Sequence, residues 1–263
     1  MIQKIYHKKD IAKDLEKGKL YNEHKEKLKI SYPLKENYES VIPLNIYQTW
    51  HSKKLPEKMF KTIKLIKNLN PRFKYQLFDD NDCREFIKNN FESDVLHSFD
   101  SLIPGAYKAD LWRYCVLYKN GGIYLDIKYK PLNNFRFITM TEKEHFVLDS
   151  DATGVYNALM VCKPGNEVLL KAINQIVKNV RNKYYGTNFL EPTGPKLLQT
   201  FFSSEEKNNF DMKHYEILNH NSKVILYNNY IIFMSYDGHI NDRIKYSKTK
   251  HYSDLWNERK IYK

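Results

Sequence analysis

Cysteine is scarce in this chain, and its spacing excludes two common uses. The 263 residues hold three cysteines, Cys83, Cys115 and Cys162, and no Cys-x-x-Cys pair. A disulfide framework or a cysteine zinc site needs more cysteines or closer ones. We therefore expect three reduced, buried thiols.

Long apolar runs are also missing. The first residues carry a charge every few positions, so no secretion signal is visible. The most apolar late stretch, 224–236, is interrupted by Asn228 and Asn229, and it is shorter than the roughly 20 residues that cross a bilayer. We expect a cytosolic location, and the positive charge leaves peripheral contact with an acidic membrane open.

Several signatures of catalysis are absent as well. The sequence has neither the glycine-rich loop of dinucleotide-binding proteins nor a P-loop, which argues against a nicotinamide-dependent oxidoreductase and a P-loop NTPase. It also lacks a nucleophile elbow and a zinc-protease helix motif. Covalent hydrolases and zinc proteases therefore have little support.

The sequence does contain enough apolar residues for a core, together with an excess of positive charge. The length of 263 residues suits one large domain or two small ones, and 42% hydrophobic residues are enough for a sizeable core. Lysine and arginine number 43 against 31 acidic residues, and the net charge of +12 favours anionic partners such as nucleotides. Because no nucleic-acid-binding motif is present and the lysines are spread along the chain, nucleic acid is not an expected partner.

The order of periodic segments predicts an α/β fold. Residues 1–40 are rich in charge with loosely spaced apolar positions, which favours an N-terminal helical extension before a main domain over 41–263. In that domain strands and helices alternate, which is typical of a mostly parallel central sheet flanked by helices, with an antiparallel element. We expect strands at 44–50, 73–78, 123–125, 146–148, 155–161, 215–217, 224–227 and 230–234, and helices at 56–69, 82–90, 105–119, 168–180 and 192–202.

Polar residues gather where predicted strands end, which is where open α/β sheets bind their ligands. Trp50 ends the first strand, and Asp126 ends the strand that follows Gly121 and Gly122. Asp110 and Arg113 stand three apart on a predicted helix and therefore project to one side. They either form an ion pair with each other or both face a cleft.

A series of short segments follows in a specific order. These segments are 42–50, 70–71, 77–80, 108–114, 118–126, 157–158, 163–165 and 193–195, followed by His251 and Trp256. Together they resemble the sugar-transferase region of glycosyltransferase family 32. That family is related to initiating yeast mannosyltransferases and, more distantly, to the glucosylating domains of clostridial toxins. The resemblance extends over about residues 42–256.

The resemblance implies a GT-A-like, Rossmann-type fold and transfer of a hexose from a UDP- or GDP-linked donor, with retention of configuration, to a glycan, lipid or protein acceptor. It implies that Trp50 stacks on the base, that Asp110 and Arg113 hold the sugar and phosphate, and that Asp126 opens a DXD motif. The other substrate-binding residues that it implies are Gly122, Asn157 on the acceptor side, and His251 and Trp256 on a segment folding over the diphosphate.

The DXD motif departs from the family pattern at its third position. In the family, its carboxylates contact the sugar or ribose and a divalent metal on the diphosphate, but Lys128 replaces the second acid here. Mn²⁺ or Mg²⁺ would then depend on Asp126, with His251 as a second candidate ligand. Two like charges ~4 Å apart at an effective dielectric of ~20 repel by about 4 kcal/mol, so Lys128 and a metal do not share a pocket comfortably.

Two arrangements of Lys128 are open. If the strand continues, Asp126 and Lys128 share a face, and the lysine neutralises the leaving diphosphate in place of a metal. If a turn forms at Ile127, Lys128 points to solvent and Asp126 holds the metal alone. The catalytic candidates are Asp126, Arg113 and Lys128. A catalytically lapsed nucleotide-sugar-binding protein and a nucleotide-sugar hydrolase are the alternative functions.

Overall fold

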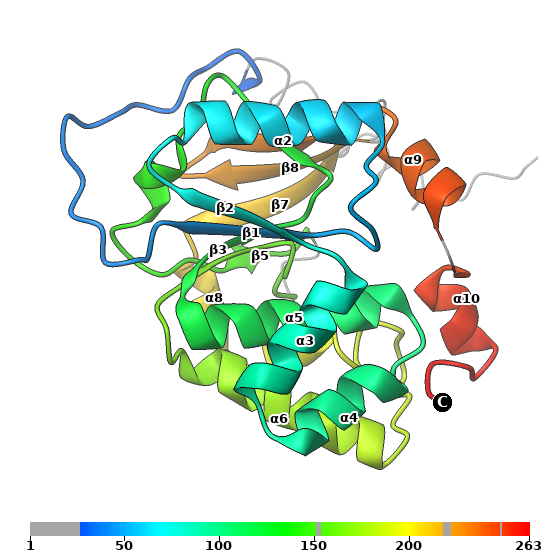
Figure 1. Ribbon diagram of the computed structural model, residues 1–263. Coiled ribbons are helices and arrows are strands. Elements are labelled where there is room, and N and C mark those ends of the chain that lie inside the picture. Colours follow the sequence, from blue (N-terminus) through cyan, green and yellow to red (C-terminus); the bar gives the residue numbers. More distant parts are fainter. Residues whose placement is uncertain (1–26, 151–153, 218–221, 248) are drawn as a thin grey trace, which may run out of the picture.

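Two β-sheets organise the chain in a computed structural model that describes residues 27–150, 154–217, 222–247 and 249–263 (Figure 1). The first sheet has four strands in the order β2-β1-β3-β6. Strand β1 pairs in parallel with β2 and β3, and β3 pairs antiparallel with β6. The bounds are β1 Asn45–Thr49, β2 Lys74–Phe78, β3 Gly122–Leu125 and β6 Leu159–Cys162.

The second sheet is larger than the antiparallel element expected from the sequence. Its order is β4-β9-β8-β7-β5, and only the β5–β7 pair is parallel. Strand β4 is a three-residue edge strand that ends in Pro131, where a missing backbone donor costs no ladder bond. The bounds are β4 Tyr129–Pro131, β5 Val147–Leu148, β7 Met212–Ile217, β8 Ser222–Tyr227 and β9 Tyr230–Ser235.

Helices cover both faces of the first sheet, as parallel strands require (Figure 1). Helix α2 (Glu57–Leu69) lies on one face, and α3 (Asp80–Asn90), α4 (Ser93–Ser101), α5 (Gly105–Asn120) and α6 (Glu167–Arg181) lie on the other. The remaining elements are η1 Phe137–Met140, α7 Pro195–Leu198, η2 Gln199–Phe201, α8 Ser204–Asn208, α9 His239–Tyr246 and α10 Tyr252–Asn257.

Helix α5 is the central helix of this arrangement. Trp112, Tyr114 and Leu117 are fully buried on it, in the apolar cluster that also takes in α3, α4 and α6. A helix that is surrounded on nearly all sides carries its polar residues inward too. Asp110 and Arg113 are therefore inside the molecule, close to the sheet. No helix in the described part of the chain is both long and apolar enough to cross a bilayer.

The α/β class with a parallel-rich sheet and flanking helices is confirmed. The helix expected at 192–202 is shorter, since α7 begins only at Pro195 and passes into the 3₁₀ turn η2. A proline is favoured at the first helical position and disfavoured inside, which sets this start. The strand expected at 155–161 is reduced to β6 plus one isolated bridge at Val155.

The N-terminal extension expected over 1–40 falls mostly on residues 1–26, outside the described residues. Residues 31–44 contain no helix. They run along the protein surface before β1, and the backbone amides of Val41 and Ile42 donate to the carbonyl of Thr141. This segment therefore attaches to the main domain by backbone pairing.

Candidate functional site

The candidate site lies where β1 and β3 end. Because the two strands are parallel neighbours, Trp50 and Asp126 leave the first sheet at the same edge. The backbone amide of Asp126 donates to the carbonyl of Ala158 at 2.7 Å, and its carbonyl accepts from the amide of Tyr129 at 3.0 Å. Asp126 thus sits on the turn that takes the chain from the first sheet into the second.

Arg113 joins the two carboxylates that the sequence singled out. Its guanidinium lies 3.4 Å from Asp110 Oδ1 and 3.3 Å from Asp126 Oδ1. Nη1 donates to the carbonyl of Asn157 at 2.9 Å, and the guanidinium carbon lies 4.4 Å from the ring centroid of Tyr124. Helix α5 therefore holds the arginine over an aromatic ring and between two acids, a geometry that suits a planar cation.

Asp110 is occupied by protein donors. Asn157 Nδ2 donates to Oδ1 at 2.9 Å and Thr193 Oγ1 donates to Oδ2 at 2.8 Å, while Asn157 Nδ2 also lies 2.8 Å from the hydroxyl of Tyr114. Burial raises the pKa of Asp110, although Arg113 counteracts it. Each carboxylate oxygen of Asp110 thus already accepts a hydrogen bond from the protein, and the clearest role of Asp110 is to position Arg113 and Asn157.

Lys128 combines features of both expected arrangements. A turn does form at Ile127, yet Lys128 does not point to solvent, and its Nζ lies 2.7 Å from Asp126 Oδ2. The ammonium is 5.2 and 5.5 Å from the ring centroids of Tyr129 and Tyr156. These two rings, joined by a hydroxyl contact of 2.8 Å, hold the lysine over the acid.

The charges in this cluster fix the protonation of Asp126. Burial alone would raise the pKa of Asp126, but Lys128 and Arg113 lower it to about 2. Burial would lower the pKa of Lys128, and Asp126 raises it above its usual value. Both groups therefore stay charged at neutral pH. The hydroxyl of Tyr124 adds a hydrogen bond of 2.7 Å to Asp126 Oδ1.

Sequence reasoning missed the tyrosines that complete the cluster. Tyr124 precedes Asp126 by two residues in β3, so the alternation of side chains along a strand could have placed both on one face. Tyr114, Tyr129 and Tyr156 come from three other segments that meet only in the folded protein. No local pattern marks them.

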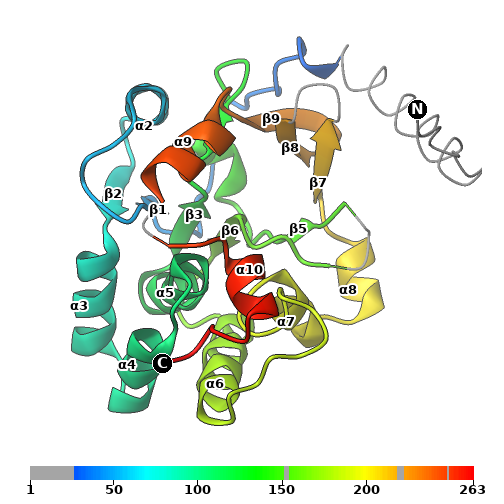
Figure 2. The ribbon, with the colours of Figure 1, turned by 90° about the vertical axis from the view of Figure 1, so that its right-hand side faces the viewer.

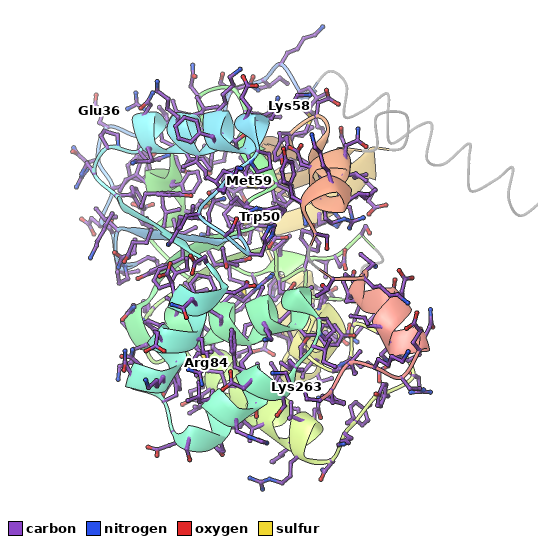
Figure 3. The ribbon with its side chains drawn as sticks, turned by 45° about the vertical axis from the view of Figure 1, so that its right-hand side comes forward. Glu36, Trp50, Lys58, Met59, Arg84 and Lys263 are labelled. Carbon is purple, nitrogen blue, oxygen red and sulfur yellow. The ribbon has the colours of Figure 1, made fainter. Side chains whose placement is uncertain are left out.

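Trp50 lies at the same edge, on the α2 side. It packs against an apolar cluster that contains Met59, Ile127 and Tyr236, and Figure 3 shows Met59 of α2 close to the indole. Its Nε1 is buried and has no hydrogen-bond partner in the described part of the chain. A buried donor without a partner costs about 1–3 kcal/mol.

The C-terminal residues belong to the helix that covers this edge. Figure 2 shows α10 beside α5, and the Tyr252 ring lies 5.9 Å from that of Tyr107. His251 contacts Ser253 at 2.7 Å and Arg243 at 3.3 Å, while Trp256 Nε1 donates to the carbonyl of Tyr185 at 2.6 Å. The hydrogen bond of Trp256 thus attaches α10 to the rest of the protein, and its N–H is not available to a nucleotide sugar.

Gly122 is not near the ligand edge, because it begins β3 while Asp126 follows its end. With φ at 115°, a Cβ there would lie 2.8 Å from the carbonyl oxygen of Asn45. The residue is needed for the close approach of β3 to β1. Gly122 was expected to contact the nucleotide sugar. In the structure its role is to let the backbone of β3 approach β1.

The described residues do not fit a divalent metal at Asp126. Oδ2 is held by Lys128, Oδ1 accepts from Tyr124 and faces Arg113, and His251 is engaged with Arg243 and Ser253. No group of three His, Cys, Asp or Glu side chains able to hold a metal occurs in the described part of the chain. An ion there would also face two cations, which Coulomb repulsion opposes.

Comparison with known proteins identifies the class. The family described as "Glycosyltransferase sugar-binding region containing DXD motif" matches residues 56–147, the segment that contains Asp110, Arg113, Asp126 and Lys128. A glycosyltransferase of Acanthamoeba polyphaga mimivirus is 30% identical over 64% of this chain and 68% of its own length. The chain belongs to this glycosyltransferase family, as its motifs predicted.

A yeast relative has a more specific name. "Inositol phosphoceramide mannosyltransferase 3" of Schizosaccharomyces pombe is 30% identical over 65% of this chain and 48% of that protein. The chain thus spans about half the length of this relative. Among solved structures, the PaToxG glycosyltransferase aligns with a TM-score of 0.49 and 18% identity, covering 74% of this chain and 80% of that one.

Proposed function

We propose that this protein is a retaining glycosyltransferase that moves a hexose from a UDP- or GDP-linked donor to an acceptor hydroxyl. The observation that carries the proposal is the cluster of Asp110, Arg113, Asp126 and Lys128 at the edge where β1 and β3 end. Two acids and two cations balance there before any ligand binds. A diphosphate arriving at this edge finds preorganised cations, and preorganised charge of this kind often lowers the activation barrier more than any other single effect.

Lys128 takes the part of the missing acid and its metal in this proposal. As the bond between the sugar and the diphosphate breaks, negative charge develops on the leaving oxygen. Lys128 is fully protonated at neutral pH, because Asp126 holds its pKa high, and it is fixed between two tyrosine rings. Arg113 supplies a second cation next to the same carboxylate. The protein's own cations therefore stabilise the departing group.

The aromatic and amide groups of the same edge orient the substrates. We assign base stacking to Trp50, with its unpartnered N–H as a further donor, and the acceptor-side wall to Asn157. Orientation of this kind supplies several kcal/mol of a transfer reaction. No covalent nucleophile is assigned.

Mannose and a phosphoinositol-bearing lipid are the first sugar and acceptor to test, because of the name of the yeast relative. Glycan and protein acceptors come next. We also propose a cytosolic location.

The test is a panel of UDP- and GDP-hexoses, first for thermal stabilisation and then for turnover. Binding at a donor concentration 100 times Kd stabilises the folded protein by about 2.7 kcal/mol, which raises Tm. One donor should stabilise, and mass-resolved products should show its sugar on an acceptor with the anomeric configuration retained. Asp126→Asn should lose turnover while the protein stays folded.

Each other outcome is informative. Stabilisation without turnover on any acceptor means a lapsed enzyme, and transfer to water alone means a hydrolase. No stabilisation by any nucleotide sugar contradicts the proposal. Full turnover by Asp126→Asn removes the carboxylate from the catalytic assignment.

A further inference from the structure

The positive charge of the chain is concentrated in one segment, contrary to the even spread expected from the sequence. Residues 51–74 hold eight lysines and arginines against one glutamate, a net +7 out of +12 for the whole chain. This segment consists of α2 and its flanks. Figure 1 shows α2 on the outside of the molecule. One outer helix and its flanks thus carry more than half of the net charge.

The outer face of α2 combines lysines with exposed apolar side chains. Met59, Ile63 and Ile66 are buried under the helix, so Lys61, Lys64 and Lys67 face outward. Phe60 is 57% exposed and Leu65 is 38% exposed on the same face. Large apolar groups among cations are typical of helices that lie in a lipid interface, where lysine stems run along the apolar layer and their ammonium groups reach the head groups.

A cavity continues this face at the C-terminal end of α2. Its volume is about 380 Å³, and its lining includes Leu69 from α2, Arg72, Arg136, and Leu34 from the N-terminal segment. Leu34 is 50% exposed. Neither Arg72 nor Arg136 forms an ion pair with any residue that the structure describes. The cavity lining therefore carries two guanidinium groups against one acid, Glu36, beside another exposed apolar side chain.

We propose that the α2 face, defined as Phe60, Lys61, Lys64, Leu65, Lys67 and the cavity at Arg72 and Arg136, docks on an anionic lipid bilayer. Phe60 and Leu65 enter the boundary between head groups and acyl chains. The lysines bind acidic head groups, each contributing about fivefold in affinity. The cavity receives a head-group phosphate between the two arginines. A guanidinium group can donate two parallel hydrogen bonds to the oxygens of one phosphate.

Apolar groups distinguish a bilayer from nucleic acid as the partner. A phenyl ring can stack on a base, but Leu65 and Leu34 gain nothing from a phosphate backbone, whereas a lipid interface buries both. Three of the large exposed apolar side chains, including Phe60, lie on this one face. The combination of charge and apolar area therefore fits a membrane better.

The position of α2 links this face to the candidate site. Its first turn follows β1 at the ligand edge, Met59 packs with Trp50, and Lys58 Nζ donates to the carbonyl of Asp237 at 3.1 Å. Figure 3 shows Lys58 at the outer end of the helix and Met59 turned inward. Docking through α2 would hold the donor site beside the bilayer, where a lipid acceptor lies. Only this link depends on the proposed function, since docking itself needs no donor.

The test is co-sedimentation of the full chain with vesicles, without donor. Vesicles of phosphatidylcholine with roughly a third phosphatidylserine should bind the protein, pure phosphatidylcholine should not, and salt should weaken binding. The variant Lys64→Gln/Lys67→Gln should bind about 25-fold more weakly. Phe60→Ser should also weaken binding.

The matched control is Lys171→Gln/Lys178→Gln, which removes the same charge from exposed positions of α6 on the opposite side of the molecule (Figure 1). It should bind vesicles nearly as the unaltered protein does. Equal losses in both double variants would overturn the assigned face, and so would unchanged binding by Phe60→Ser. Tight binding of single-stranded DNA without vesicle binding would assign the face to nucleic acid instead. None of the α2 variants should change donor stabilisation, which separates this test from that of the proposed function.

Discussion

At the scale of single residues, the candidate site depends on how Asp126 is satisfied. One carboxylate receives Lys128, Tyr124 and Arg113 at 2.7, 2.7 and 3.3 Å, and this crowding explains why its pKa is lowered to about 2 despite burial. Asp110 balances Arg113 from the other side. In the proposed mechanism a donor diphosphate competes with Asp126 for Lys128, so binding of the donor is coupled to release of the lysine from Asp126.

Removing the ammonium of Lys128 is the sharpest test at this scale. Lys128→Met keeps the length of the side chain but removes its charge, and turnover should fall about 10²- to 10³-fold, as for other transition-state donors. Lys128→Arg retains a cation and should recover much of the rate. The measurement is the turnover rate of both variants by steady-state kinetics, corrected for the fraction of folded protein.

The control is Lys130→Met, two residues further along the same segment, which should leave turnover unchanged. Full turnover by Lys128→Met would remove the lysine from the mechanism. A Lys128→Asp variant that gains Mn²⁺ dependence would support the exchange of a metal for a fixed cation.

At the scale of elements, the link between α5 and β3 places the arginine over the acid. Helix α5 ends at Asn120 and is capped by Gly121, which has a φ of 61°, and Gly122 then starts β3 with a φ of 115°. A Cβ on Gly121 would lie 2.6 Å from Pro164 Cδ. The two glycines let β3 begin directly against its neighbours, and this fixes the offset between Arg113 on the helix and Asp126 on the strand.

Gly122→Ala tests this link. The new Cβ would lie 2.8 Å from the Asn45 carbonyl and force a left-handed backbone on alanine, so we expect a loss of about 2–4 kcal/mol in unfolding free energy. Gly105→Ala at the start of α5 is the control. It meets nothing within 4 Å and should be neutral or slightly stabilising. Urea unfolding of both variants measures the difference, and equal stabilities would contradict the steric argument.

At the scale of the whole molecule, two sheets share one interior. Strand β3 runs directly through the Asp126 turn into β4, and the chain returns from β5 in the second sheet to β6 in the first. His145 lies at this junction, 4% exposed, with its amide and carbonyl paired to Val161 and its ring 5.0 Å from that of Tyr227. Burial and the charge of Lys143 lower the pKa of His145 to about 4.

This histidine predicts a pH dependence of folding. The pKa of His145 is about 4 in the folded protein, against the ordinary value of 6.5 that applies to the unfolded chain. The unfolded chain therefore binds the proton more tightly. The free energy of unfolding is therefore unaffected by this group above pH 6.5, and it decreases by up to about 3 kcal/mol as the pH falls toward 4. Urea unfolding of His145→Gln and the unaltered protein across this range should show a steeper decline for the unaltered protein. Parallel declines would contradict the assignment.

The sequence predicted the elements whose signals are local. A period of about 3.6 residues indicated α6, prolines marked the start and end of α2, and the paired glycines marked the end of α5. The spacing of three residues placed Asp110 and Arg113 on one side of a helix, and the family resemblance, not a local pattern, grouped them with Asp126. Family membership followed from these motifs. Residue spacing can predict helices and strands because their backbone hydrogen bonds and side-chain faces are set by residues only a few positions apart.

Only the tertiary structure decided the environment of those residues. The sequence left Lys128 between two arrangements, and the fold combined a turn with an inward lysine because Tyr129 and Tyr156 meet beside Asp126. The second sheet, the engagement of His251 and the partners of Asp110 likewise depend on segments far apart in the chain. Burial, charge pairing and packing are set by such long-range contacts, which no local pattern records.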